Sequence, residues 1–206
     1  MAQIPTHEAL PPEVCYGGGV DIYAEGRLRH LHLKIGEGIV ALRPALISTV
    51  LGSCVAATFF HEESGMAAIF HAMLPTAAGS RDGDTTPCKY VDTAINTLLS
   101  RFERERVPLS AIEVKLFGGS YSLNNDDKRA TRTLVDVGGR NVEMARERLA
   151  ARGLDPRSEH VMGDRGRKLV FHAGTGEVWV RMLGMPDTSV SEGWLSFPRR
   201  RTPTRR

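Results

Sequence analysis

The feature that most constrains the fold of this chain is a pair of apolar, β-prone segments separated by a short polar turn. The first reads ISTVLGSCVAATFF (47–60), the second reads MAAIFHAMLP (66–75), and HEESG lies between them. Apolar runs that are rich in β-branched and aromatic residues and bounded by turn residues indicate buried strands. The sequence therefore predicts two buried strands joined as a hairpin.

The segments that follow alternate between helical and strand periodicity. The strand AIEVKLF (111–117) places Glu113 and Lys115 on one face, and a basic helix is expected from about 141 to 152, ending before Gly153. The segments KLVFHA and EVWVRM around the turn GTG predict a second hairpin. An earlier helix is expected from apolar residues at helical spacing, namely Val91, Ala94, Ile95, Leu98, Leu99 and Phe102. No repeat or linker interrupts this order, so we expect one compact α/β domain.

The two ends of the chain differ from its centre. Residues 1–30 contain Pro11-Pro12 and a glycine run and are expected to be a loosely ordered extension; residues 31–185 form the predicted domain, and 186–206 a second extension. Five arginines lie in the last eight residues, which leaves 22 basic against 24 acidic residues elsewhere, a net of −2. Such a tail can contact RNA or an acidic surface. A solvated terminus is the simpler interpretation, because a nucleic-acid enzyme spreads its positive charge over a folded face. No nucleic-acid partner is expected.

Several classes of protein are disfavoured. No apolar run approaches the ~20 residues that span a bilayer, and the N-terminus lacks the basic start and apolar stretch of a secretory signal. Three widely spaced cysteines do not suggest a disulfide framework, so we expect a reduced, cytoplasmic protein without membrane insertion. Neither CxxC nor HExxH occurs, and no phosphate-binding or GxSxG motif is present, so neither a metal nor an organic cofactor is expected.

Cys54 is the candidate catalytic residue. Gly52 and Ser53 precede it inside an apolar run, where glycine usually marks a bulge or a close backbone approach. A nucleophilic thiol needs a base or an imidazolium nearby. Counting outward from the HEESG turn places His71 across from Cys54 if the two strands pair. Two interpretations stay open from the residues alone: a catalytic pair, or a core cysteine beside a hydrogen-bonded core histidine.

The blocks of the chain also resemble a known family in their order and spacing. TVLGSCVA with His71 in HAMLP, then KYVDTAINTLLSRF, KLFGGS, GGRNVEMARERLAARGL and GDRGRKLVFHAGTGEVWVRM, are similar to the chemoreceptor glutamine deamidases. The resemblance extends from about residue 33 to 183. It implies an α/β fold in which β-sheet layers carry a Cys–His pair and are flanked by helices. It also implies hydrolysis of glutamine side-chain amides on methyl-accepting chemotaxis receptors to glutamate and ammonia.

The resemblance assigns roles to individual residues. The nucleophile falls on Cys54 and the histidine on His71, and a hydroxyl residue upstream falls on Ser48 by strict count, with Thr49 adjacent. The backbone N–H groups around Gly52 and Ser53 are candidates for the oxyanion hole. A protein-glutamine glutaminase is therefore expected. The alternative is a binding module that engages a response-regulator phosphatase of the chemotaxis pathway, with catalysis secondary.

Overall fold

Two six-stranded β-sheets pack face to face in the structure, a computed structural model that describes residues 13–16, 22–25, 28–42, 44–78, 86–121, 136–184 and 193–198. The first sheet contains, in spatial order, β1 (Glu13–Tyr16), β4 (Gly38–Ala41), β7 (Met66–Ala72), β6 (Val55–His61), β8 (Glu113–Gly118) and β9 (Ser158–Val161). The second contains β12 (Trp194–Phe197), β11 (Val178–Met182), β10 (Arg167–His172), β5 (Ala45–Leu51), β3 (Leu28–His32) and β2 (Ile22–Glu25).

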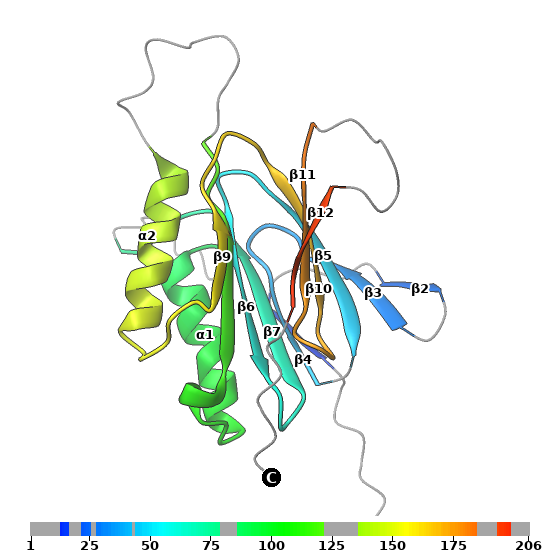
Figure 1. Cartoon of the computed structure of the whole chain (residues 1–206). Helices are drawn as coiled ribbons and strands as arrows, with labels where there is room; N and C mark the ends of the chain where they lie inside the picture. The colour runs from blue at the N-terminus through cyan, green and yellow to red at the C-terminus, as the bar shows by residue number, and fades with distance from the viewer. Residues whose placement is uncertain are drawn as a thin grey trace, which may run out of the picture.

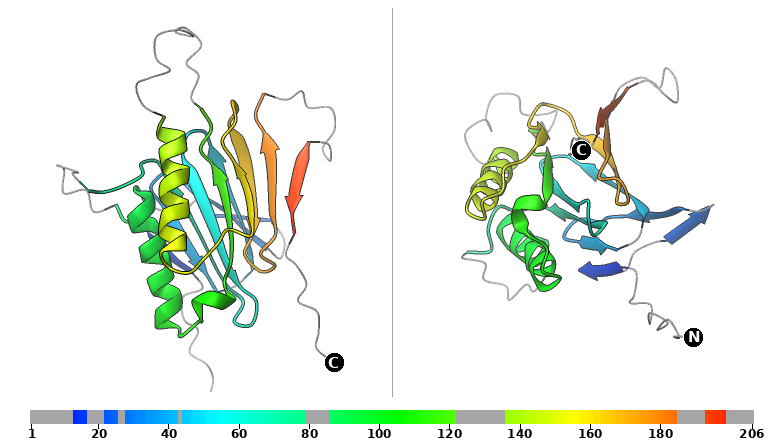
Figure 2. Two further views of the ribbon diagram at one scale, coloured as in Figure 1. Left: turned by 60° about the vertical axis from the view of Figure 1, so that its left-hand side comes forward. Right: turned by 60° about the horizontal axis from the view of Figure 1, so that its bottom comes forward.

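Both α-helices lie on the outer face of the first sheet, as Figure 1 and Figure 2 show. They are α1 (Val91–Arg104) and α2 (Val137–Ala150), with a 3₁₀ turn, η1 (Leu109–Ala111), after α1. The predicted α/β domain is confirmed at this coarse level, although strands outnumber helices and the helices cover one sheet only. Among the described residues, no helix is both long enough and apolar enough to cross a membrane.

The first sheet is buried on both faces, which gives the molecule two apolar cores. On the helix side, Phe59, Phe70 and Phe102 pack with the apolar face of α1. Between the sheets, Ile69 and Phe117 belong to the core that the second sheet covers. This arrangement explains the continuous apolar character of β6 and β7, because every residue of these two strands is buried.

The predicted hairpin of β10 and β11 is confirmed, but the single strand predicted over 47–60 is wrong. That stretch is divided at residues 52–54 into β5, in the second sheet, and β6, in the first, and only β6 forms the predicted hairpin with β7. A continuous apolar run does not reveal such a break, because both strands are buried. Strands β6 and β7 pair in antiparallel fashion from His61 opposite Met66. Strands β10 and β11 pair from Arg167 opposite Met182. The helix predicted from Val91 also forms, and its six predicted apolar positions are all buried.

Helix α2 begins earlier than predicted. Its first residue is Val137 rather than Asn141, and the Oδ1 atom of the N-cap residue Asp136 accepts a hydrogen bond of 2.8 Å from the Gly139 amide. A Cβ atom at Gly138 would lie 2.7 Å from the Gly119 carbonyl oxygen. Gly138 disfavours a helix when the sequence is considered locally, but its missing Cβ atom allows α2 to pack directly on the backbone that follows β8.

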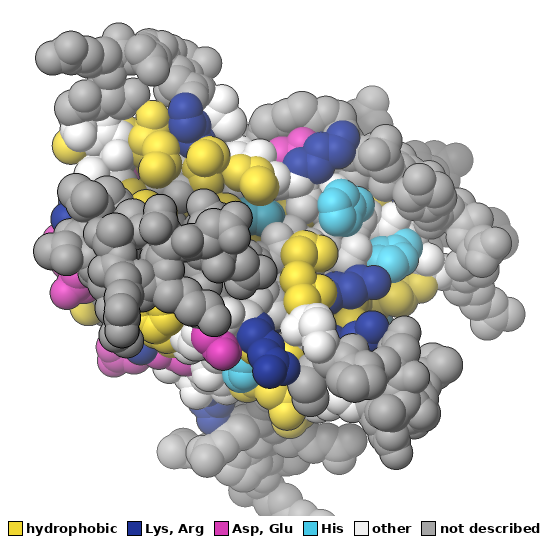
Figure 3. Space-filling model, turned by 90° about the horizontal axis from the view of Figure 1, so that it is seen from above, with side chains coloured by type: hydrophobic (Ala, Val, Ile, Leu, Met, Phe, Trp, Pro, Cys, Tyr) yellow, Lys and Arg dark blue, Asp and Glu magenta, His cyan; other side chains and the backbone are white. Residues whose placement is uncertain are grey.

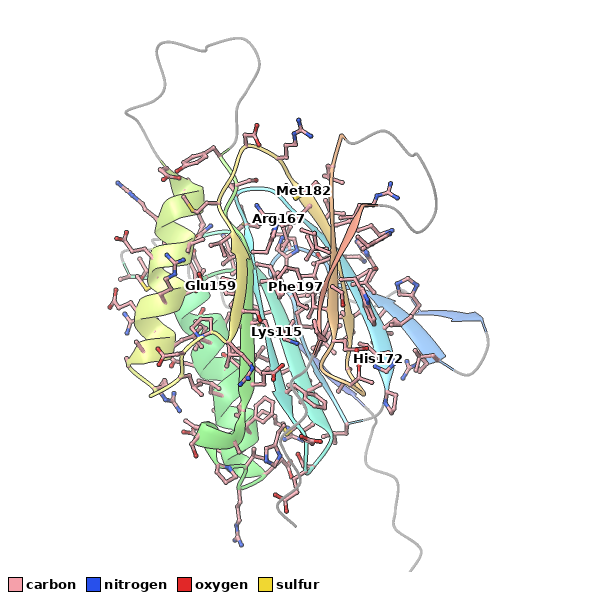
Figure 4. The ribbon with its side chains drawn as sticks, in the orientation of Figure 1. Lys115, Glu159, Arg167, His172, Met182 and Phe197 are labelled. Atoms are coloured by element: carbon pink, nitrogen blue, oxygen red, sulfur yellow. The ribbon has the colours of Figure 1, made fainter. Side chains whose placement is uncertain are left out.

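Lys115 differs from the expectation of a polar strand face. The predicted alternation of β8 is correct, but the second face lies between the sheets, and Lys115 is buried. Its Nζ donates to the Gly176 carbonyl at 2.6 Å and to the Phe197 carbonyl at 3.0 Å, and it lies 3.0 Å from Glu113 Oε1. Figure 4 shows Lys115 and Phe197 between the two sheets. A buried charge of this kind needs such partners.

The predicted domain boundaries stay predictions. Strands β1 and β2 lie within residues 1–30 and pair with β4 and β3, respectively, and β12 lies within residues 186–206 and pairs with β11. The glycine run Gly17–Gly19 and the arginine tail 199–206 lie outside the described residues.

Candidate functional site

The candidate residues gather at one end of the two sheets, the upper end in Figure 1. Strand β5 ends at Leu51, and a turn of Gly52, Ser53 and Cys54 carries the chain across to the start of β6 at Val55. His71 lies next to the last residue of β7, which returns to the same end. We call residues 52–54 the cysteine turn. The cysteine turn therefore joins the second sheet to the first.

Cys54 and His71 share a face of the first sheet but are not directly opposite. The residue paired with His71 is Ala56, two positions after Cys54. Because side chains alternate, Cys54, Ala56 and His71 all point toward the core between the sheets. The pairing is thus displaced by two residues from the predicted direct opposition of Cys54 and His71, which gives a diagonal relation. A one-residue slip would have placed the two side chains on opposite faces.

A hydrogen-bonded chain fixes the imidazole of His71. The hydroxyl of Thr49 donates to the Leu33 carbonyl at 2.8 Å, and the same oxygen lies 2.8 Å from His71 Nδ1. Since the single hydroxyl proton goes to Leu33, the Thr49 oxygen accepts and Nδ1 carries the ring proton. Nε2 is therefore left as the basic nitrogen, and it has no hydrogen-bond partner among the described residues, Cys54 included.

Ser48 and Thr49 occupy different sides of β5. Both side chains are buried, but successive residues of a strand point to opposite faces. Ile47 and Leu51 lie in the core between the sheets, which places Thr49 on that same face and Ser48 on the other. Of the two hydroxyl residues predicted, the structure joins Thr49 to His71.

Burial favours the neutral forms of both candidate groups. His71 is only 2% exposed, and this burial lowers its pKa from 6.5 to about 4; the Leu33 backbone opposes this shift, and the proximity of His32 adds to it by a smaller amount. Burial also raises the pKa of the half-buried Cys54 thiol, against a smaller opposing effect of its own backbone N–H. The unliganded site therefore holds a thiol and a neutral imidazole.

Every carbonyl oxygen of the cysteine turn accepts a hydrogen bond from a neighbouring element. The Ser120 amide donates to Gly52 at 2.9 Å, the Asn141 side chain to Ser53 at 3.0 Å, and the Gly119 amide to Cys54 at 2.8 Å. The described hydrogen bonds use none of the N–H groups of Gly52 and Ser53. The turn is thus anchored through its oxygens, which leaves these N–H groups available.

Two glycines at the end of β8 make this anchoring possible. Gly118 has φ +107°, and a Cβ atom there would lie 2.2 Å from the Cys54 carbonyl oxygen. Gly118-Gly119 therefore serves a close backbone approach. By contrast, a Cβ atom at Gly52 would meet nothing within 4 Å, so Gly52 borders open space.

Asn141 is the site residue that the sequence did not reveal. It is fully buried on α2, and its Nδ2 donates both to Ser53 in the cysteine turn and, at 3.1 Å, to the carbonyl of Met73 beyond β7. A single asparagine on a basic helix carries no motif, so only the packing of α2 could identify it. Among the described residues, no group of three or more His, Cys, Asp or Glu side chains could hold a metal ion.

Comparison with known proteins places the chain in a family. Residues 73–182 match the family model described as CheD chemotactic sensory transduction, a range that begins after Cys54 and His71. A protein of Nitratidesulfovibrio vulgaris named probable chemoreceptor glutamine deamidase CheD is 62% identical over 156 residues, covering 76% of this chain and 78% of the relative. A protein of the same name from Oleidesulfovibrio alaskensis is 53% identical over 160 residues, covering 78% and 76%. The chemoreceptor glutamine deamidase CheD of Thermotoga maritima is 32% identical over 153 residues, covering 74% and 91%. This chain belongs to the CheD family.

Proposed function

We propose that this protein is a chemoreceptor glutamine deamidase, which hydrolyses glutamine side-chain amides of chemotaxis receptors to glutamate and ammonia. The names of its relatives support the activity. The observation that carries the assignment to residues is the Thr49–His71 hydrogen bond, because it leaves Nε2 basic on the face that Cys54 shares. Cys54 is the proposed nucleophile, His71 the acid–base group, and Thr49 the residue that orients it.

The first half of the reaction forms a thioester. As the Cys54 sulfur attacks the glutamine Cδ, His71 Nε2 takes the thiol proton, so no thiolate has to exist beforehand in the buried site. The tetrahedral intermediate then collapses when the imidazolium gives that proton to the amide nitrogen. The C–N bond breaks and ammonia leaves as a neutral molecule.

The second half returns the enzyme to its starting state. The neutral His71 takes a proton from water, whose oxygen attacks the thioester carbonyl. The C–S bond breaks, the proton passes to the Cys54 sulfur, and the substrate leaves as a carboxylic acid. Each oxyanion formed on the way needs donors, and the uncommitted N–H groups of Gly52 and Ser53 support their proposed role as an oxyanion hole.

An apolar border around the site supports a protein substrate. Six large apolar side chains are exposed among the described residues, and four lie close to the site; these four, which we call the apolar rim, are Ile35, Met73, Tyr121 and Leu183. Met73 follows His71 by two residues, and Tyr121 follows Ser120, which bonds to Gly52.

The other two members are joined to the site through glycines. Ile35 precedes Gly36, whose amide donates to the His71 carbonyl. Leu183 donates its amide to the carbonyl of Gly166, where a Cβ atom would lie 3.1 Å from the carbonyl oxygen of Leu51, the residue before the cysteine turn. Figure 3 shows hydrophobic groups at this end beside histidines, lysines and arginines. An exposed apolar border of this kind is typical of a protein-binding site. We propose that it receives the cytoplasmic helices of a receptor, and that the protein acts in the cytoplasm.

The proposal is tested by intact-mass analysis of a purified receptor cytoplasmic fragment incubated with the protein. We expect the mass gain that accompanies conversion of amides to acids, and its complete loss in Cys54→Ser. Cys88→Ala removes another thiol, one that packs on the helix side of the first sheet, and should leave the mass gain intact. Wild-type protein that leaves every receptor unchanged would instead favour a binding module, and an active Cys54→Ser variant would show that Cys54 is not the nucleophile.

A further inference from the structure

The side chain of Asn141 connects the two segments that carry the proposed catalytic groups. One Nδ2 hydrogen bond goes to Ser53, the residue before Cys54, and the other goes to Met73, two residues after His71. Both acceptors are carbonyl oxygens, so the amide must present its nitrogen to them. The two hydrogens of one NH₂ group are thereby fully used. The distance between the two backbone segments is consequently set by a single planar group.

This connection lies where the β-ladder no longer controls the geometry. The pairing of β6 with β7 ends at Val55 opposite Ala72, so Cys54 and Met73 lie just beyond the last ladder pair. Amide–carbonyl bonds from Ser120 and Gly119 hold the cysteine turn to the end of β8, but neither reaches the β7 side. Asn141 spans the gap that the ladder leaves open.

Helix α2 is itself firmly seated against this end of the sheet. The side chain of Val142 would be 2.4 Å from a Cβ atom at Gly119, and a Cβ atom at Gly138 would lie 2.7 Å from the Gly119 carbonyl oxygen and 2.8 Å from that of Ser120. Asn141 is completely buried, and its Oδ1 atom has no hydrogen-bond partner among the described residues. The described polar contacts of the Asn141 side chain are therefore the two hydrogen bonds that its Nδ2 donates. An apolar residue would suffice at this position if α2 needed only to pack against the sheet.

We infer that Asn141 is a positioning residue for deamidation: by bridging Ser53 and Met73 it holds Cys54 in register with His71. This inference rests on the proposed function. Reacting groups must be aligned to a fraction of an ångström, and a misplacement of ~1 Å can cost ~100-fold in rate. The bridge touches neither substrate nor the reacting atoms, so its loss should reduce kcat while KM for the receptor changes little.

The test compares Asn141→Ala and the volume-matched Asn141→Thr, whose one hydroxyl cannot bridge both carbonyls, with Leu149→Ala. Leu149 is a fully buried residue of the same helix that packs in the helix-side core. We expect a fall in kcat of ~100-fold for both Asn141 variants, with KM within threefold of wild type. Leu149→Ala should lower the melting temperature at least as much as Asn141→Ala and leave kcat within threefold. Asn141→Thr has nearly the same volume and buries no charge, so it keeps the test usable if the alanine variant does not fold.

Two results would overturn the inference. One is a kcat within threefold of wild type in a folded Asn141 variant. The other is an equal fall in kcat for Leu149→Ala, because general loosening of α2 would then account for the effect. In either case wild-type turnover and its loss in Cys54→Ser would be unaffected, so the failure of this inference is distinguishable from failure of the proposed function.

Discussion

Two buried polar side chains of the first sheet, Lys115 and His71, differ in how completely their polar atoms are hydrogen-bonded. Both face the space between the sheets, and neither is more than 2% exposed. The ammonium of Lys115 has two carbonyl acceptors and an ion pair with Glu113. The imidazole of His71 has one nitrogen bonded to Thr49 and the other without a partner among the described residues.

The difference separates a polar side chain that holds the two sheets together from the one that we propose as the acid–base group. Lys115 connects β8 to the β10–β11 turn and to β12, so its partners fasten the second sheet to the first. His71 is oriented by its partner, and the open nitrogen remains free to exchange a proton. A buried polar atom without a partner is costly, and it is therefore informative where the thiol proposed as the nucleophile lies on the same face.

Removing the imidazole of His71 is the strongest test of its proposed acid–base role. His71→Gln should lower kcat by roughly 100- to 10,000-fold, because no other group takes and returns the thiol proton. The matched control is His61→Gln, which changes a buried histidine at the far end of the same hairpin. Receptor deamidation followed by mass analysis measures both. Comparable losses in the two variants would remove the distinction between His71 and a structural histidine.

The two adjacent hydroxyl residues provide a sharper test. Thr49→Val keeps the side-chain shape, removes the bond that fixes the His71 tautomer, and should lower kcat by roughly 10- to 1000-fold. Ser48→Ala changes the opposite face of β5 and should stay within threefold of wild type. The rates of the two purified variants at equal receptor concentration decide the matter. A larger loss in Ser48→Ala would reassign the third residue of the site.

Lys115→Met tests the structural side of the comparison. Loss of one partner from a buried ionic cluster should reduce the free energy of unfolding by about 3 to 5 kcal/mol, because Glu113 and two carbonyls lose their donor. Urea denaturation monitored by circular dichroism measures this change. The folded variant should keep kcat within threefold of wild type. A fall in kcat as large as that of Thr49→Val would mean that the two clusters are coupled.

The pH dependence of stability gives the smallest expected effect. The folded-state pKa of His71 is about 4, below its ordinary 6.5, so the folded form binds a proton less readily than the unfolded chain. The resulting stability is fully present above pH 6.5 and is lost as pH falls toward 4, by up to about 3 kcal/mol. Urea titrations of wild type and His71→Gln between pH 7.5 and 4.5 should therefore converge as pH falls. Parallel curves would show that burial does not shift this group.

Local sequence patterns predicted which helices and strands form better than they predicted where each one begins and ends. The period of Val91 to Phe102 identified α1, and the turn around GTG identified the β10–β11 hairpin. The start of α2 was misjudged because Gly138 and Gly139 disfavour a helix locally. Packing against Gly119 decides otherwise, since only a residue without a Cβ atom fits there.

The sequence by itself determined the central hairpin, placed Cys54 and His71 near one end of it, and indicated a family through the order of its blocks. The tertiary structure alone decided that these two residues share a face, that Thr49 rather than Ser48 bonds His71, and that Asn141 reaches the cysteine turn. It also buried Lys115. The physical reason is that alternation along a strand is local, whereas register and the covering of each face depend on strands and helices far away in the chain.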